Sequence, residues 1–315
     1  MCGRVKTRSG DIGLADLLDA AFLMVKNFLL VEGSREETAV TTQFEGKVAF
    51  ITGAARGQGR SHAVRFAEEG ADIIAVDLCE QMSSVAYPMA TPEDLDETVN
   101  LVEKTGRRIV AEQADVRDFQ RLKSVLDSGV VELGRLDFVL ANAGIGLLGG
   151  EPSYDISAYL DAVNVMLNGV YFTIEAALPA LLEHGDGGAI VITNSDAGFK
   201  SVVPTFRTRS HGAAGYTAAK HGVIGLMRYY ARTLAEKNIR VNTVHPCAVA
   251  TPMIQNEQTE QFIAEFPELG DYLQAPLVPV IELVDISEAM IYLCGQSGRY
   301  VTGVTLPVDA GLAVK

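Results

Sequence analysis

The 315-residue sequence predicts an α/β fold built on one doubly wound, parallel sheet of seven strands. From residue 45 onward, short apolar runs rich in β-branched residues alternate with helical patterns. The first run leads into a glycine-rich turn that opens a helix, and the second run ends on Asp77. Parallel strands need crossover connections, which are usually helices that cover both faces of the sheet. Right-handed crossovers of this kind give a Rossmann-type fold.

Each element follows from its own pattern in the sequence. The strands are expected at residues 47–52, 71–77, 108–114, 136–141, 189–193, 240–245 and 304–308. The helices are expected from the glycine-rich turn to about residue 69, and at residues 92–105, 118–132, 154–184, 214–237 and 284–294.

The length alone suggests two domains, but the sequence indicates one domain and an extension. No internal repeat, second core or low-complexity linker follows residue 45, so residues 45–315 are expected to form a single domain. Residues 1–44 are expected to form an N-terminal helical extension, with an amphipathic helix at residues 12–31 and a polar linker. Asp16, Asp19 and Lys26 interrupt that apolar stretch, which disfavours a cleaved signal peptide. Whether the helix packs on the domain, contacts a partner subunit or is dispensable stays open.

The composition excludes several classes of protein. Hydrophobic residues make up 48% and charged residues 21%, as in globular proteins with a sizeable core. The 26 basic and 40 acidic residues give a net charge of −14, which repels nucleic acid. No apolar stretch is expected to span a bilayer.

The four cysteines argue against metal and disulfide chemistry. Cys2, Cys79, Cys247 and Cys294 lie far apart, with no C-x-x-C pair and no clustered histidines. We therefore expect neither a metal site nor a disulfide framework. Reduced thiols are typical of a cytoplasmic protein, which is the location we predict.

The glycine-rich turn after the first strand predicts a dinucleotide site. Residues 52–59 read TGAARGQG, and this stretch opens a helix, whose N-terminus attracts a pyrophosphate. A plain strand-to-helix turn is the alternative. The candidate cofactor ligands in the turn are Gly53, Arg56, Gly57, Gln58 and Gly59.

The second strand adds a signal for the type of cofactor. A carboxylate at Asp77 can accept hydrogen bonds from ribose hydroxyls and would repel a 2′-phosphate, which favours NAD over NADP. Arg56 is placed to favour a 2′-phosphate instead. We give Asp77 the greater weight, because an unpaired carboxylate beside a phosphate costs more than an exposed arginine gains.

A second motif predicts the chemistry. Of the ten tyrosines, only Tyr216 has a lysine, Lys220, four positions later. Residues so spaced share a helix face. The ammonium group and an oxidised nicotinamide would both stabilise the phenolate and lower the pKa of Tyr216 toward neutral pH.

With these motifs, the chain resembles the short-chain dehydrogenase/reductase family over residues 45–315. Residues 115–116 (DV), 141–144 (ANAG) and 245–251 (HPCAVAT) match further family elements, although Cys247 replaces the usual glycine. The resemblance implies that these elements bind the cofactor through Asp115, Val116, Asn142, Ala143, Gly144, Pro246, Val249 and Thr251, and that Tyr216 and Lys220 contact it too. It makes Tyr216 the acid/base, Lys220 its electrostatic partner and Ser195 the ligand of the reacting oxygen.

One family position is altered. The place usually held by a helix asparagine carries Met166, with Asn164 and Asn168 two residues to either side. Two residues correspond to about 200° around a helix, so neither asparagine substitutes unless the helix register is locally distorted. Whether either of them takes that role stays open.

The resemblance narrows further to the mycofactocin-coupled, carveol-dehydrogenase-like subfamily. Its signals are residues 53–62, residues 217–223 and an insertion at residues 79–89 that lies beside the adenosine half of the cofactor. It implies a tightly held NAD recycled by mycofactocin, and interconversion of a small apolar secondary alcohol, such as a terpenoid alcohol, and a ketone. It also implies a homo-oligomer, a tetramer by family resemblance. Residues 247–281 would form an apolar lid, and the loop at residues 199–213 would cover the substrate pocket.

Two other functions stay open from the sequence. The chain could be an ordinary reductase with freely exchanging NAD(P)H. It could also be a nucleotide-binding regulatory protein without catalysis, a hypothesis that Met166 motivates.

Overall fold

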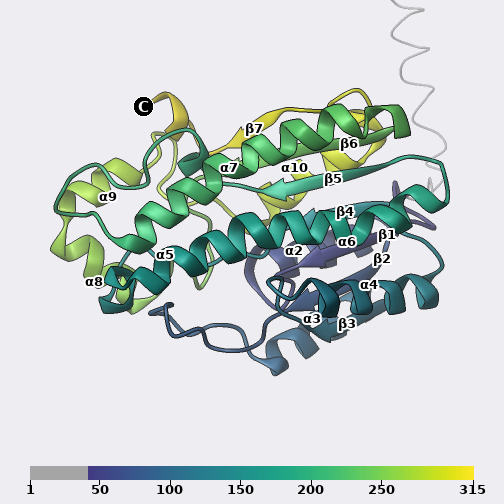
Figure 1. The fold of residues 1–315 in the computed structure, drawn as a ribbon, viewed down its shortest axis with the longest axis horizontal. Coiled ribbons are helices and arrows are strands. Elements are labelled where there is room, and N and C mark those ends of the chain that lie inside the picture. The colour runs from purple at the N-terminus through teal and green to yellow at the C-terminus, as the bar shows by residue number, and fades with distance from the viewer. Residues whose placement is uncertain (1–41) are drawn as a thin grey trace, which may run out of the picture. The chain divides into compact units, whose positions relative to one another are not determined.

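All seven predicted strands are present and pair in parallel in one sheet (Figure 1). The computed structural model describes residues 42–315, which form one compact unit, so Cys2 and the helix predicted at residues 12–31 lie outside the described residues. The strands are β1 (Val48–Thr52), β2 (Asp72–Asp77), β3 (Ile109–Gln113), β4 (Phe138–Ala141), β5 (Gly188–Thr193), β6 (Ile239–Pro246) and β7 (Thr305–Val308).

The strand order places a crevice at the middle of the sheet. The order is β3-β2-β1-β4-β5-β6-β7, so the chain changes direction across the sheet between β1 and β4. In doubly wound folds, ligands bind beyond the carboxyl ends of the strands at such a switch point.

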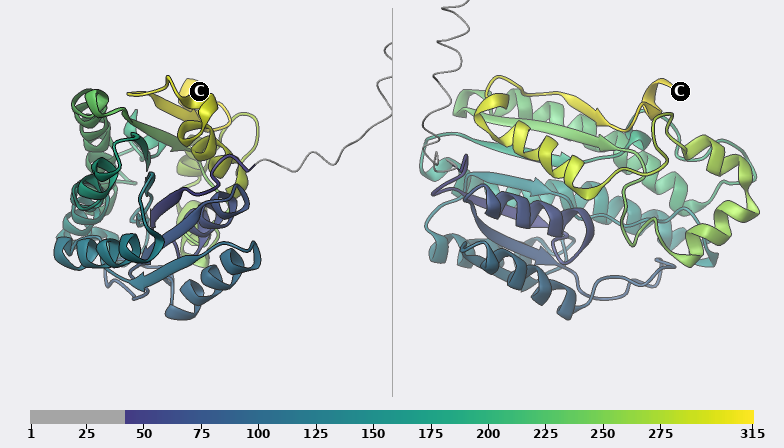
Figure 2. Two further views of the ribbon diagram at one scale, coloured as in Figure 1. Left: turned by 90° about the vertical axis from the view of Figure 1, so that its right-hand side faces the viewer. Right: turned by 180° about the vertical axis from the view of Figure 1, so that it is seen from behind.

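Helices cover both faces of the sheet (Figure 2). The helices are α2 (Gly57–Glu68), α3 (Pro92–Lys104), α4 (Phe119–Leu133), α5 (Ile156–Val163), α6 (Gly169–Glu183), α7 (His211–Thr233), α8 (Glu257–Glu265), α9 (Pro267–Leu273) and α10 (Leu283–Cys294). Helices α2, α3 and α10 lie on one face, and α4, α5, α6 and α7 lie on the other. Each face buries its own apolar core.

The folded unit begins before residue 45. Phe44, which the sequence prediction placed in the extension, is 1% exposed. Its ring stacks on Phe66 of α2 at 5.0 Å between centroids and lies 4.7 Å from the ring of Phe138 on β4. Burial of an aromatic ring of this size contributes about 2 kcal/mol, so the domain boundary moves ahead of Phe44.

The helix predicted at residues 154–184 contains a distorted turn. Helices α5 and α6 are joined by a π-helical turn over Asn164–Asn168. The joined helix, Ile156–Glu183, is long and apolar enough to span a membrane by length and composition, which the sequence reading did not expect. Half of its most apolar window is buried, and it packs against α4, α7 and the sheet. It is therefore a core helix of the unit.

Candidate active site

The glycine-rich turn is built by close backbone approach. A side chain at Gly59 would place its Cβ 1.9 Å from the carbonyl oxygen of Gly53. Gly53 has a φ of +68° and lies against the backbone of Ala143, where a Cβ would come within 2.8 Å. These positions therefore require glycine, and the turn leaves the N-terminus of α2 open to the crevice.

Asn142 ties three central strands together below this turn. Its side-chain Nδ2 donates to the carbonyl oxygens of Thr52 and Gly53 at 3.0 and 3.3 Å. Its Oδ1 accepts a hydrogen bond from the hydroxyl of Thr193 at 3.0 Å. The side chain thus supports the ends of β1, β4 and β5 and fixes the floor of the crevice.

Asp77 closes β2 at the edge of the same crevice. Its carboxylate accepts hydrogen bonds from the backbone N–H of Ala55 at 2.9 Å and of Cys79 at 3.2 Å. Burial raises the pKa of Asp77 above its ordinary value, although these two hydrogen bonds and Arg56 oppose the shift. A carboxylate has about four acceptor sites, so it keeps capacity for further donors such as ribose hydroxyls.

Arg56 is engaged by the insertion after β2. Its guanidinium donates to the carbonyl oxygen of Pro88 at 2.5 Å. This insertion, residues 79–89, is also held by a hydrogen bond from Ser84 to Asp161 at 2.7 Å, and the hydroxyl of Tyr87 accepts one from Gly146 N–H at 3.0 Å. We call residues 79–89 the flap.

Most of the predicted cofactor ligands line one cavity. They are Gly53, Arg56, Gly57, Gln58, Gly59, Asp77, Asp115, Val116, Asn142, Ala143, Gly144, Tyr216, Lys220 and Thr251. Pro246 and Val249 are buried nearby, outside this lining. Sequence reasoning missed other lining residues, chiefly Leu78, Met82, Tyr87, Met89 and Ala90 in and beside the flap, and Thr193, Asn194, Pro252 and Met253.

Two residues of this cavity have buried side-chain oxygens that accept no hydrogen bond. Among the described residues, Gln58 Oε1 and Asn194 Oδ1 are buried side-chain acceptors without a hydrogen-bond partner. A buried polar atom without a partner is unfavourable, so such atoms in a cavity indicate a ligand with N–H or O–H groups. The glycine-built turn, Asp77 and these acceptors together fit a dinucleotide.

Tyr216 and Lys220 lie on α7, which begins three residues earlier than predicted. The side chain of Ser210 caps it by accepting from Ala213 N–H at 3.0 Å. Lys220 Nζ lies 5.7 Å from the centre of the Tyr216 ring and donates to the carbonyl oxygen of Thr193 at 2.9 Å.

The pKa of Tyr216 differs from the sequence expectation. Burial raises it to about 12, and burial lowers that of Lys220 to about 8. The Tyr216 pKa is therefore not lowered in this structure, because burial is the largest effect on it. Hydrogen bonding with Ser195 acts in the lowering direction.

Ser195 sits where β5 ends, beside Tyr216 but outside the cavity lining. It is 8% exposed, and its Oγ donates to Asp196 Oδ1 at 2.9 Å while accepting from Ala197 N–H at 3.2 Å. His245 Nδ1 lies 2.8 Å from the carbonyl oxygen of Ser195. Burial lowers the pKa of His245 to about 4, so the ring is neutral and donates this hydrogen bond.

Neither asparagine near Met166 reaches the cavity. Asn168 is exposed and donates to Asn164 Oδ1 at 3.0 Å, whereas Val165 and Met166 line the cavity. The π-helical turn supplies the register distortion that the sequence left open, yet it directs the methionine inward. The asparagine side chains therefore do not take the place of the residue at 166.

A second, apolar cavity adjoins the first. Its volume is about 630 Å³, within the range of small-molecule sites. Tyr216, Tyr87 and Met253 line both cavities, so the two cavities meet at these three side chains. Most of the remaining wall comes from α8, α9 and the segments beside them, including Phe262, Ile263, Leu269 and Leu273.

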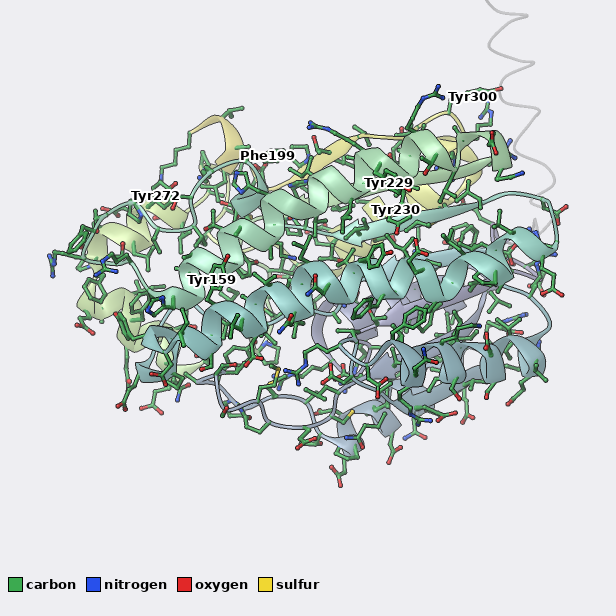
Figure 3. The ribbon with its side chains drawn as sticks, viewed as in Figure 1. Tyr159, Phe199, Tyr229, Tyr230, Tyr272 and Tyr300 are labelled. Carbon is green, nitrogen blue, oxygen red and sulfur yellow. The ribbon has the colours of Figure 1, made fainter. Side chains whose placement is uncertain are left out.

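The loop after β5 plays a different part from the one expected. Residues 199–210 do not line the apolar cavity; Val203 packs against Phe262 of α8 and Leu269 of α9, which do. Arg207 lies 3.7 Å from Glu268, and the Tyr272 hydroxyl donates to Ser201 O at 2.7 Å. Figure 3 shows Phe199 on this loop and Tyr272 on α9. The loop therefore supports the lid formed by α8 and α9.

The described residues hold no group of three or more histidine, cysteine or acidic side chains suited to a metal ion. Cys79, Cys247 and Cys294 are free thiols.

Comparisons with known proteins agree on the family. Residues 53–313 match a family model described as enoyl-(acyl carrier protein) reductase. The chain is 44% identical to (−)-trans-carveol dehydrogenase of Rhodococcus erythropolis, covering 86% of this chain and 99% of that one. It is 30% identical to cyclohexanol dehydrogenase of an Acinetobacter strain, covering 89% and 100%.

A solved structure extends the likeness to three dimensions. The crystal structure of carveol dehydrogenase from Mycobacterium avium in complex with NAD is 48% identical, with a TM-score of 0.80, and the match covers 87% of this chain and 100% of that one. The chain belongs to the short-chain dehydrogenase/reductase family. Within it, the chain is similar to the carveol dehydrogenases.

Proposed function

We propose that this protein is an NAD-dependent dehydrogenase that interconverts a small apolar secondary alcohol and its ketone. The observation that carries the proposal is that Tyr216 lines both the dinucleotide cavity and the apolar cavity. An apolar wall favours a substrate with little polarity beyond the reacting oxygen. The names of the relatives, carveol and cyclohexanol dehydrogenases, are consistent with this class.

The residues of the chain have distinct roles in this reaction. Bound NAD supplies the hydride acceptor. The Tyr216 hydroxyl exchanges the proton of the alcohol oxygen, Ser195 orients that oxygen by a hydrogen bond, and Lys220 holds positive charge beside the tyrosine. The positive charge of an oxidised nicotinamide opposes the effect of burial on the Tyr216 pKa.

Several contacts favour NAD over NADP. Asp77 faces the cavity, and Arg56 is bonded to the flap rather than free to meet a 2′-phosphate. The test is turnover of cyclohexanol and carveol with each nucleotide by the wild-type protein and by Tyr216→Phe. We expect at least a ~100-fold loss in Tyr216→Phe, because a phenyl ring cannot carry the proton. Tyr300→Phe, a change at a residue that is 87% exposed, is the matched control.

A folded Tyr216→Phe variant with wild-type turnover would exclude the proposed chemistry. Nucleotide binding without turnover of either alcohol by the wild-type protein would favour the regulatory alternative, which rests on Met166 at the cavity.

We further propose that NAD is held tightly and recycled in place by mycofactocin. The flap supports this, because three hydrogen bonds, through Arg56, Tyr87 and Ser84, hold it to the domain beside the nucleotide cavity. The test is to purify the protein without added nucleotide, denature it and identify what is released. NAD at close to one equivalent is the expected result. An empty protein that works with free NAD(P)H would favour the ordinary-reductase alternative.

We also propose that the protein is a homo-oligomer, a tetramer by family resemblance, and that it is located in the cytoplasm. Large apolar side chains are exposed on α5, α6 and α7, namely Ile156, Leu160, Tyr171 and Tyr229, the last of which is labelled in Figure 3. Exposed apolar groups gathered on neighbouring helices favour a subunit contact. Light scattering of the wild-type protein and of a Leu160→Glu, Tyr171→Glu variant measures whether that contact holds the oligomer together.

A further inference from the structure

A buried carboxylate next to Ser195 has no role in the proposed chemistry so far. Asp196 begins the short 3₁₀ turn that follows β5 and is 6% exposed. Its Oδ1 accepts the hydroxyl of Ser195 at 2.9 Å. Its Oδ2 is buried without a hydrogen-bond partner among the described residues, and the Lys200 ammonium lies 3.7 Å away, beyond hydrogen-bond distance.

A purely structural role would not require this carboxylate. The turn is already capped by the Ser195 hydroxyl, which accepts from Ala197 N–H. Burying a carboxylate oxygen without a donor is unfavourable, so a neutral side chain would serve the fold better. The cost is explained if the carboxylate takes up a proton during the reaction.

Ser195 connects this carboxylate to the reacting tyrosine. Its hydroxyl donates to Asp196, and the same serine lowers the pKa of Tyr216. The next charged group outward is Lys200, whose side chain is 26% exposed and lies over the ring of Tyr272. Tyr216, Ser195, Asp196 and Lys200 thus follow one another from the cavity to the surface, with a hydrogen bond between Ser195 and Asp196 and 3.7 Å between Asp196 and Lys200.

We propose that Ser195 and Asp196 form a proton path that carries the proton of the substrate alcohol from Tyr216 to solvent beside Lys200. The inference rests on the proposed dehydrogenase function. A proton path through Ser195 and Asp196 is also consistent with the methionine at position 166. Met166 lines the cavity, and its thioether cannot carry a proton.

The steps balance in protons and electrons. In alcohol oxidation, the C–H bond breaks with its electron pair passing to NAD, and the O–H proton moves to the Tyr216 phenolate. Tyr216 then gives a proton to Ser195 Oγ while Ser195 passes its own hydroxyl proton to Asp196. The carboxylic acid so formed loses that proton to water, and the Lys200 ammonium favours the return of the carboxylate charge. Ketone reduction runs the same steps in reverse.

The surroundings of Asp196 set the direction of its titration. Burial raises its pKa, and the negative charge of Asp309 adds to this, whereas the Ser195 hydrogen bond, Lys200 and the backbone N–H of Ala197 oppose it. The titratable and charged groups that face it are Lys200, Asp309, Tyr216, Tyr272, Cys247 and, through Ser195, His245. Oxidation needs the carboxylate form, so its rate should rise with pH through this raised value.

The first test is the single-turnover rate of cyclohexanol oxidation by NAD-loaded protein between pH 5 and 9. Asp196→Asn keeps the shape but cannot accept the proton, so the rate should fall at least about tenfold and lose its rising limb. Lys200→Met removes the positive charge that lowers the pKa of Asp196. The rise of the rate with pH should therefore occur at higher pH in this variant. Asp127→Asn, a change in an exposed pair on α4, is the charge-matched control. An Asp196→Asn variant within twofold of wild type, with the limb unchanged, would overturn the proposal.

The second test needs neither cofactor nor substrate. The ultraviolet difference between the wild-type protein and Tyr216→Phe reports ionisation of Tyr216 alone. Because Asp196 raises the pKa of Tyr216, Asp196→Asn should shift this titration to lower pH, and Asp127→Asn should not. An unchanged midpoint would show that the two groups are not coupled. Absence of turnover in the wild-type protein, by contrast, would count against the dehydrogenase function. The titration of Tyr216 could still be measured in that case.

Discussion

The two cavities that meet at Tyr216 are built in different ways. The dinucleotide cavity lies on the ends of β1, β4 and β5, with glycines packed backbone to backbone and Asn142 bonded across three strands. The apolar cavity is closed by α8 and α9, whose inner side chains contact few other elements. The first wall tolerates almost no added atom, whereas the second can adapt to substrates of different shape.

The largest loss of nucleotide binding is expected in the glycine-rich turn, where two backbone segments approach each other most closely. Gly59→Ala would place a Cβ 1.9 Å from the carbonyl oxygen of Gly53, so the turn must open. We expect complete loss of nucleotide binding, measured by calorimetry with NAD. Gly225→Ala on α7 is the matched control, since its Cβ meets nothing within 4 Å and a helical alanine is favoured by about 1 kcal/mol. A Gly59→Ala variant that binds NAD normally would show that the close backbone packing of this turn is not needed for nucleotide binding.

A smaller effect is expected at the ribose end of the same cavity. Because burial raises the pKa of Asp77, its carboxylate is lost at a higher pH than for an ordinary aspartate. NAD affinity should therefore fall as the pH is lowered through that raised value, by about tenfold for one lost charged hydrogen bond. Asp77→Asn should bind more weakly at neutral pH and show a flat profile. Identical pH profiles for the two proteins would exclude this role.

A substitution in the lid is expected to weaken substrate binding without weakening NAD binding. Phe262 of α8 is 7% exposed and lines the apolar cavity. Phe262→Ala removes apolar contact, so KM for cyclic alcohols should rise about tenfold while NAD affinity stays unchanged. The free energy of unfolding should fall by about 3 kcal/mol, which thermal melting measures. Val284→Ala, an exposed change on α10, is the control.

The smallest effect is expected at the flap. Arg56→Met removes the hydrogen bond to Pro88, a single contact at an exposed site. The rate of NAD release, followed by stopped-flow displacement, should increase by about three- to tenfold, which corresponds to about 1 kcal/mol. The exposed Arg228→Met change on α7 should leave release unchanged. If both variants release NAD at the wild-type rate, the flap is not held through Arg56.

The same contrast explains what the sequence could predict. The sheet and the dinucleotide cavity follow from β-branched runs, glycines and Asp77, which act locally. An apolar lid over residues 247–281 was predicted, but its helices were not, because α8 has only nine residues and α9 only seven. Their start signals are present, since Asn256 caps α8 by accepting from Thr259 N–H and Pro267 begins α9. The inward position of Met166 depends on the register of the π-helical turn. The raised pKa of Tyr216 depends on burial. A pattern of residues in the sequence contains neither kind of information.

The most direct test of the account uses the nucleotide that the protein retains. Purified protein is mixed with cyclohexanol or carveol without free nucleotide, and absorbance of protein-bound NADH is followed. We predict one equivalent of NADH per active site in the wild-type protein, then a halt, and none in Tyr216→Phe. Absence of retained NAD, or turnover that continues only with added free nucleotide, would contradict the account.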